Sequence, residues 1–303
     1  MVFYHYDKSS FATDMELAMR PVAKTLFVIF ALLFGGCAGE GSLESKQDET
    51  PARGAASAGF VPRGCPAQSS NLVEFAKELV KHGEQKFGSD HPATAFYINR
   101  LAGLYGAQGC YAEAEPLFKR ALAIWEKAHG PDHLSVGENL SDLAGLYFDQ
   151  GRYPEAKPLY ERALAIREKA LEPDDLRVAL SLNNLGELYR VQGRYAEAES
   201  LHKRALAIRE KGSWPDNPRA AHSLHNLVLV YRAQGRYAEA EPLLIRALAI
   251  WKKSLGDDLL YEAMSLENYA GLLRETGRGV EAAKMEARAK AIRAKRAKEN
   301  PAK

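Results

Sequence analysis

Apolar residues recur with a helical period from residue 71 almost to the end of the chain. Leu182, Leu185 and Tyr189 are three and four residues apart, so they share one face of a helix. A polar run at Gly193 interrupts this stripe, and a second stripe follows and ends at Ile208. No segment shows the two-residue alternation of a half-buried strand. The pattern predicts two helices, a first helix A and a second helix B, and an all-α fold.

This helix pair is repeated five times with a period of 42 residues. Repeats 1 to 5 are residues 91–132, 133–174, 175–216, 217–258 and 259–300. Each has a glycine between its two helices and two alanines in helix B: Gly109, Gly151, Gly193, Gly235 and Gly277, then Ala114, Ala156, Ala198, Ala240 and Ala282, and Ala121, Ala163, Ala205, Ala247 and Ala289. Closely crossing helices need small residues where they touch. We therefore expect the helices to stack at short distance.

Both ends of the repeat array differ from its middle. Residues 71–90 align with helix B of repeat 1 and predict a half-repeat cap. The last repeat ends in a basic helix that contains Lys295, Arg296 and Lys298. We expect this helix to close the stack, because its polar outer face needs no neighbour. The alternative is a basic surface for anionic lipid head groups or an acidic partner.

The repeat resembles a known family. Leu185-Gly186-x-x-Tyr189, followed by Gly193, Tyr195 and two alanines, is similar to the tetratricopeptide repeat. The common unit has about 34 residues, and the longer unit here resembles the repeats of kinesin light chains. The resemblance implies a right-handed α-solenoid of stacked antiparallel helix pairs with a concave groove, and a scaffold that binds proteins.

The resemblance also indicates where a partner would bind. In tetratricopeptide domains, asparagines on helix A project into the groove and bond the backbone of a bound peptide, since an amide both donates and accepts. Three successive repeats carry such an asparagine, and other polar residues flank them or take the matching place. We predict a peptide-binding groove lined by Asn99, Arg100, Asp142, Asn183, Asn184, Arg190, His225, Asn226, Arg232 and Asn268.

The first seventy residues have a different composition. Arg20 and Lys24 precede a short apolar run that ends in Gly35-Gly36-Cys37, which is the order of parts in a secretory signal. The run is too short to span a bilayer. Its end resembles the lipobox of bacterial lipoproteins, with Phe34 where that family usually has Leu. We predict a signal peptide at 1–36, with 1–18 as a mis-assigned start, and lipidation of Cys37.

This reading predicts an exported lipoprotein at the periplasmic face of a bacterial membrane, with the outer membrane favoured. Residues 37–70 are rich in Gly, Ala, Ser and Pro and predict a disordered tether. In an oxidising compartment, Cys65 in this tether could form a disulfide with Cys110 in the first A–B turn. A cytoplasmic tetratricopeptide adaptor or regulatory subunit is the alternative, and it requires an uncleaved N-terminus.

Composition and spacing argue against several other functions. The 41 basic and 39 acidic side chains give a net charge of +2, so we expect no nucleic-acid partner. His129 and His133 are separated by Gly130-Pro131, and His222 and His225 lack a third ligand, so we expect no metal site. No nucleophile or phosphate-binding motif is present. We expect no enzyme, cofactor or small-molecule substrate; an uncharacterised enzyme or metal-binding accessory is the second alternative.

Overall fold

The computed structural model describes residues 71–211, 218–254 and 259–299, which all belong to one compact unit. Within these ranges the chain forms helices and no strand, as the sequence pattern predicts. The predicted signal peptide and tether, with Cys37 and Cys65, lie outside the described residues. The helices are α3 (Asn71–Phe87), α4 (Pro92–Ala107), α5 (Tyr111–His129), α6 (Leu134–Asp149), α7 (Tyr153–Ala170), α8 (Leu176–Val191), α9 (Tyr195–Glu210), α10 (Pro218–Ala233), α11 (Tyr237–Ser254), α12 (Leu259–Glu275) and α13 (Gly279–Glu299).

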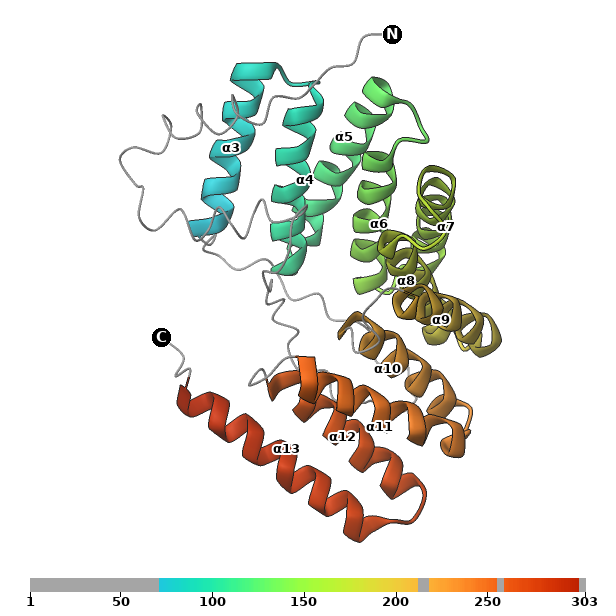
Figure 1. Cartoon of the computed structure of the whole chain (residues 1–303). Coiled ribbons are helices and arrows are strands. Elements are labelled where there is room, and N and C mark those ends of the chain that lie inside the picture. Colours follow the sequence, from blue (N-terminus) through green and yellow to red (C-terminus); the bar gives the residue numbers. More distant parts are fainter. Residues whose placement is uncertain (1–70, 212–217, 255–258, 300–303) are drawn as a thin grey trace. The chain divides into compact units, whose positions relative to one another are not determined.

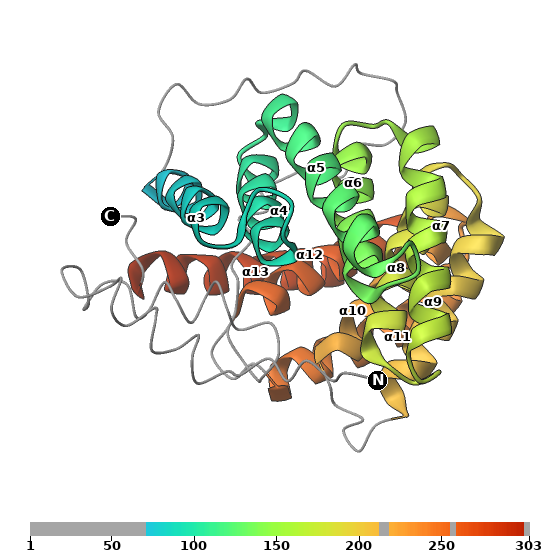
Figure 2. The same ribbon diagram turned by 90° about the horizontal axis from the view of Figure 1, so that it is seen from above.

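Each helix packs against the next one along the chain (Figures 1 and 2). The even-numbered helices α4 to α12 are the A helices of repeats 1 to 5, and the odd-numbered helices α5 to α13 are their B helices. Helix A contacts helix B of its own repeat and of the preceding one, so α3 takes the place of a preceding helix B for α4. In addition, α4 contacts α6, α6 contacts α8, and α8 contacts α10. The fold is the predicted all-α stack of helix pairs.

Small and branched apolar residues fill the space between the helices. In repeat 3, Leu182 and Leu188 of α8 and Ala198 and Ala205 of α9 are all fully buried. The alanines at these two places are buried in the other repeats as well. A larger side chain there would hold the helices apart, which explains why the sequence keeps them small.

The turn within each repeat depends on its glycine. Gly193 has φ +74°, which is costly for residues with a Cβ atom, and its neighbour Arg194 donates from its backbone nitrogen to the carbonyl of Tyr189 at 2.8 Å. The described turns before α4, α6 and α8 end instead in side-chain caps. The imidazole of His133 accepts from the backbone nitrogen of Ser135 at 3.2 Å, and so starts α6.

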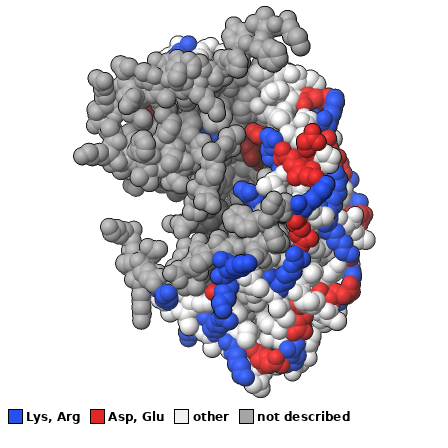
Figure 3. Space-filling view, in the orientation of Figure 1, with Lys and Arg blue, Asp and Glu red and all other residues white. Residues whose placement is uncertain are grey.

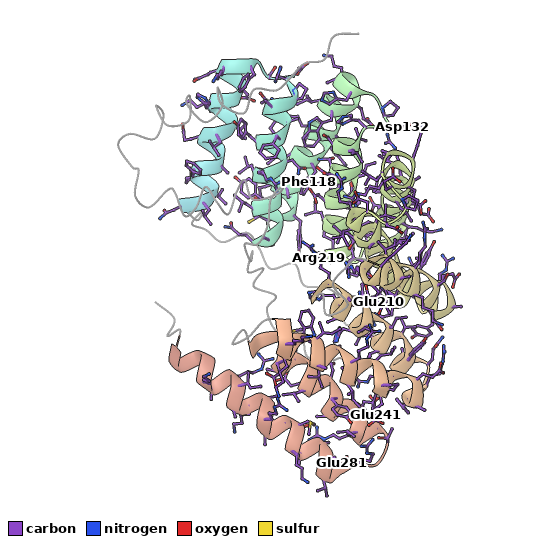
Figure 4. All side chains as sticks on the ribbon, in the orientation of Figure 1. Phe118, Asp132, Glu210, Arg219, Glu241 and Glu281 are labelled. Atoms are coloured by element: carbon purple, nitrogen blue, oxygen red, sulfur yellow. The ribbon has the colours of Figure 1, made fainter. Side chains whose placement is uncertain are left out.

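Ion pairs between repeats fix the register of the stack. Arg236 in the turn of repeat 4 lies 4.2 Å from the ring centre of Tyr231 and bonds to Glu199 of repeat 3 and Glu239 of repeat 4. The Arg236 bond lowers the pKa of Glu199 to about 2. Arg152, two repeats earlier, and Arg278, one repeat later, form the same two ion pairs. Figure 4 labels both carboxylates that hold Arg278: Glu241 and Glu281. The pairs are partly exposed, so their role is alignment more than stability.

Candidate functional site

One side of every helix A is left uncovered by its neighbours. On α8 it starts at Leu176 and Leu180, which are 38% and 46% exposed although they are apolar, and continues through the partly exposed Asn184, Glu187 and Val191. These residues are three or four positions apart and share one face. The matching residues of the other repeats are also at least partly exposed. We define this A-helix face by the α8 residues and by Pro92, Phe96, Arg100, Gly103, Ala107, Leu134, Glu138, Asp142, Gly145, Asp149, His222, Asn226, Leu229, Ala233, Met264, Asn268, Gly271 and Glu275.

Three of the predicted asparagines lie on this face. Asn184 and Asn226 are partly exposed, and neither side chain makes a hydrogen bond within the described part of the chain. Asn268 donates its amide to the carbonyl of Met264, one turn earlier on its own helix, at 3.0 Å. Two of the three amides therefore keep all their donors and acceptors for a ligand.

Asn183 does not lie on the A-helix face, so its predicted place in the groove is wrong. It is only 6% exposed and points between the repeats, where it meets His202 of α9 and Ser223 and Arg209 of the next junction. The hydrogen-bond network favours the amide orientation in which its nitrogen donates to His202 Nδ1 at 2.9 Å and its oxygen accepts from Arg209 at 2.7 Å. Residues 183 and 184 are adjacent, and one step along a helix turns the side chain by about 100°.

The charged residues predicted beside the asparagines are held by partners. Arg190 forms two bonds to Glu187 on its own helix, at 2.7 and 2.6 Å. Arg232 forms two bonds to Glu275 of the next repeat, and its guanidinium occupies space left by Gly271, where a Cβ atom would lie 2.9 Å from Nη2. Arg232 therefore connects α10 to α12, whereas Arg190 is held along its own helix.

The first two repeats contribute a different group. Arg100 is exposed and lies 5.1 Å from the ring centre of Phe96. Asn99 donates to the carboxylate of Asp142 at 2.9 Å and accepts from Asn139 at 2.6 Å. The sequence reasoning missed Phe96 and the exposed leucines of α8. Their register offered the signal, because they lie four or eight positions before the predicted polar residues on the same helical face.

The histidines serve packing and capping. The rings of His129 and His133 stack with centres 4.4 Å apart, and His222 contacts Trp251 edge-on at 4.6 Å. His225 is partly buried, and burial lowers its pKa. No group of three metal-ligating side chains occurs in the ranges that the structure describes. None of the helices in those ranges has the length and apolarity needed to cross a membrane.

Cys110 is 1% exposed and disulfide-bonded. It takes the place that Arg152, Arg236 and Arg278 occupy in later repeats. The acid that would face an arginine here is absent, because the matching position in α3 is Val73. The chain's other cysteines are Cys37 and Cys65, both outside the described residues.

Both signs of charge occur on the described surface seen in Figure 3, and they alternate most closely on its right-hand side. Lysine and arginine are interspersed with aspartate and glutamate on the described surface in this view, and many of them form the ion pairs between repeats.

Comparison with known proteins places the chain in a family. Residues 93–169, 135–211 and 219–295 match the tetratricopeptide repeat, and together these matches span more than half of the chain. None of the curated proteins is similar enough to count as a match.

Solved structures agree with this assignment. Kinesin-light-chain-like repeats from Podosopora anserina are 29% identical with a TM-score of 0.60, covering 69% of this chain and 98% of theirs. BtubC (BKLC) from P. vanneervenii is 25% identical with a TM-score of 0.64, covering 75% of this chain and 92% of its own. RapI, 19% identical with a TM-score of 0.55, covers 75% of this chain and 94% of its own and shares the fold. The chain belongs to the tetratricopeptide repeat family, with kinesin-light-chain-like proteins among its structural neighbours.

Proposed function

We propose that this protein is a non-catalytic scaffold whose A-helix face binds an extended segment of a partner protein. The observation that carries the proposal is the pair Asn184 and Asn226, which occupy the same position in successive repeats and have unused amide groups. An extended backbone presents N–H and C=O groups that an amide can pair at both atoms. The exposed Leu176 and Leu180 beside them supply apolar contact to the segment's side chains.

The first experiment compares the tagged native chain with Asn184→Ala/Asn226→Ala in co-purification from its own cells. The control is Gln85→Ala/Ser200→Ala, which changes two exposed polar residues on helices α3 and α9, away from the A-helix face. We expect a partner to be retained by the native chain and the control and lost from the asparagine variant. A partner that stays bound to the asparagine variant would contradict binding on this face. The binding site would then lie on the B helices or on the basic C-terminal helix.

We further propose export and lipid anchoring at Cys37. The disulfide at Cys110 supports this compartment, because disulfides persist where the surroundings are oxidising. Mass spectrometry of the mature N-terminus tests the proposal, and we expect a chain that begins at a lipid-modified Cys37. An unprocessed N-terminus would instead support the cytoplasmic adaptor.

The disulfide partner has its own test. We propose Cys65, because a lipidated Cys37 has its sulfur in a thioether and cannot pair. Peptide maps with and without reduction should show Cys110 joined to Cys65 in protein from its own compartment. A bridge from Cys110 to Cys37 would contradict both the pairing and the lipidation.

A further inference from the structure

Repeat 2 differs from the other repeats in the charge of its A-helix face. Glu138, Asp142 and Asp149 all lie on the exposed side of α6, and Gly145 lies between the two aspartates. Positions 142, 145 and 149 are three and four residues apart and therefore adjacent on one side of the helix. The absence of a side chain at Gly145 leaves the space between the two carboxylates open to a neighbouring helix.

Tyr160 of α7 reaches into that space. It is 6% exposed, and its hydroxyl oxygen lies 3.6 Å from the place where a Cβ atom of Gly145 would be. Three tyrosines of helix A, Tyr147, Tyr189 and Tyr231, each donate to a glutamate. The hydroxyl of Tyr160, on helix B, has no hydrogen-bond partner in the described part of the chain. The Tyr160 side chain is thus largely buried, while its hydroxyl keeps its hydrogen-bonding capacity for a ligand atom at this point.

The hydroxyl also lies within electrostatic range of carboxylates from two repeats. Burial raises the pKa of Tyr160, and the negative charges of Asp149, Asp142 and Glu187 raise it further. The phenol is therefore a neutral group surrounded by anions. The equivalent positions carry Phe118 in repeat 1 (labelled in Figure 4), His202 in repeat 3 and Leu244 in repeat 4, so only repeat 2 of these four brings a hydroxyl to the face.

The nearby arginines form no ion pair with either aspartate within the described residues, although the charges of Arg100 and Arg167 oppose the rise that burial causes in the pKa of Asp142. Arg190 is bonded to Glu187, and Arg167 is buried and donates to Ser181 at 2.5 Å. Arg100 lies over the ring of Phe96, and Asp142 forms no ion pair in the part of the chain that the structure describes. Asp142 accepts one bond from Asn99, and Asp149 has no partner in the described ranges, so burial raises its pKa.

We infer that Asp142, Asp149 and Tyr160, gathered around Gly145, bind the side chain of a lysine or arginine in the partner segment. This repeat-2 acidic site rests on the proposed function and specifies its ligand. The cation would donate to the two carboxylates and to the acceptor lone pairs of the Tyr160 oxygen, so that one side chain of the partner engages all three groups. Charge complementarity thus selects a basic extended segment over an acidic one.

The test uses the full chain and an acetylated hexapeptide library in which one position at a time is fixed, read by fluorescence polarisation. We expect peptides with a fixed Lys or Arg at one position to bind about tenfold or more tightly than those with Glu there, the effect of a charge-assisted hydrogen bond. Asp142→Asn/Asp149→Asn should abolish this preference. Glu113→Gln/Glu172→Gln, which removes the same charge from exposed positions off the face, should retain it.

A second variant separates the site from general charge effects. Tyr160→Phe places in repeat 2 the residue that repeat 1 carries naturally, so it should fold normally and still weaken binding of the basic peptides. Spermidine serves as the free cation and should bind less tightly than the peptide. A preference for Lys or Arg that survives the aspartate double variant, or spermidine that binds as well as the peptide, overturns the inference. Absence of binding by any peptide overturns the proposed function as well.

Discussion

One position of helix B, at the junction with the next repeat, carries an apolar side chain in repeat 1 and a charged side chain in repeat 3. Between repeats 1 and 2 the position is Trp125, which is 6% exposed and makes an apolar contact layer. Between repeats 3 and 4 it is Arg209, which is 7% exposed and donates to the carbonyl of Arg219 at 2.7 Å and to Ser223 at 2.9 Å. Burial lowers the pKa of Arg209 to about 10, and its Nε atom has no partner. One backbone geometry thus accepts either solution, and in the polar one some buried nitrogen atoms stay without a partner.

The polar junction extends into repeat 3. Asn183 connects Arg209 and Ser223 to His202, whose ring lies against Gly186. Repeat 1 has Ala102 and Phe118 at the places of Gly186 and His202, with no polar atom to satisfy. We therefore expect the apolar junction to lose stability through lost contact area and the polar one through unpaired groups and protonation.

The largest effect should come from Trp125→Ala. Removing a buried tryptophan leaves a cavity in the apolar junction and should cost about 3–5 kcal/mol of unfolding free energy. Urea denaturation followed by circular dichroism measures the change. Arg120→Ala, which removes one partly exposed ion pair on the same helix, is the control and should cost about 1 kcal/mol or less.

Acid should weaken the polar junction through His202. His202 is fully buried, and burial, with the charges of Arg190 and Arg209, lowers its pKa to about 4. Since this pKa lies below the ordinary 6.5, the stability due to neutral His202 is complete above pH 6.5 and is lost as the pH falls toward 4, amounting to about 3 kcal/mol. His202→Leu should remove this part of the pH dependence. Equal pH dependence in the two proteins would contradict it.

Adding one methyl group should have opposite effects on stability at Gly186, beside the His202 ring, and at Gly103, which faces open space. A Cβ atom at Gly186 would lie 2.7 Å from the His202 ring, so Gly186→Ala should destabilise the chain by about 1–3 kcal/mol. Gly103→Ala, at a helical position where a Cβ atom meets nothing within 4 Å, should stabilise it by about 0.5–1 kcal/mol. Thermal unfolding of both variants measures the difference. Combining Gly186→Ala with His202→Leu should recover most of the loss, because the clash partner is gone.

The smallest effect is expected from Arg209→Met. An apolar side chain of similar length removes a buried charge at the same time as its bonds, so stability should change by about 1 kcal/mol or less. Ser223→Ala leaves the guanidinium buried with fewer partners and should cost more than Arg209→Met. A larger loss for Arg209→Met than for Ser223→Ala would show that the guanidinium stabilises this junction.

The sequence was sufficient for the elements and their order. The period placed every described helix, and the glycines marked the A–B turns where φ is positive. The sequence did not correctly predict which residues form the exposed face of helix A, because the prediction placed Asn183 in the groove together with Asn184. The helical period does place Leu180 and Asn184 on one face. The sequence of a single helix does not show, however, which of its polar faces the neighbouring helices will cover.

Tyr160 could not be placed from the sequence. It is one of the tyrosines of helix B, and its approach to Gly145, Asp142 and Asp149 depends on how α7 rotates against α6. The same holds for the pairing of Arg209 with Ser223 across a junction.

The amino-acid sequence by itself determined the helices, the turns and the family, because these depend on local periodicity and on residues that recur at one spacing. Only the tertiary structure decided which polar side chains became buried partners, such as Asn183 and His202, and which stayed available, such as Asn184 and Asp149. The physical reason is that a helix fixes the angles among its own side chains, whereas the packing of its neighbours fixes which angle faces solvent.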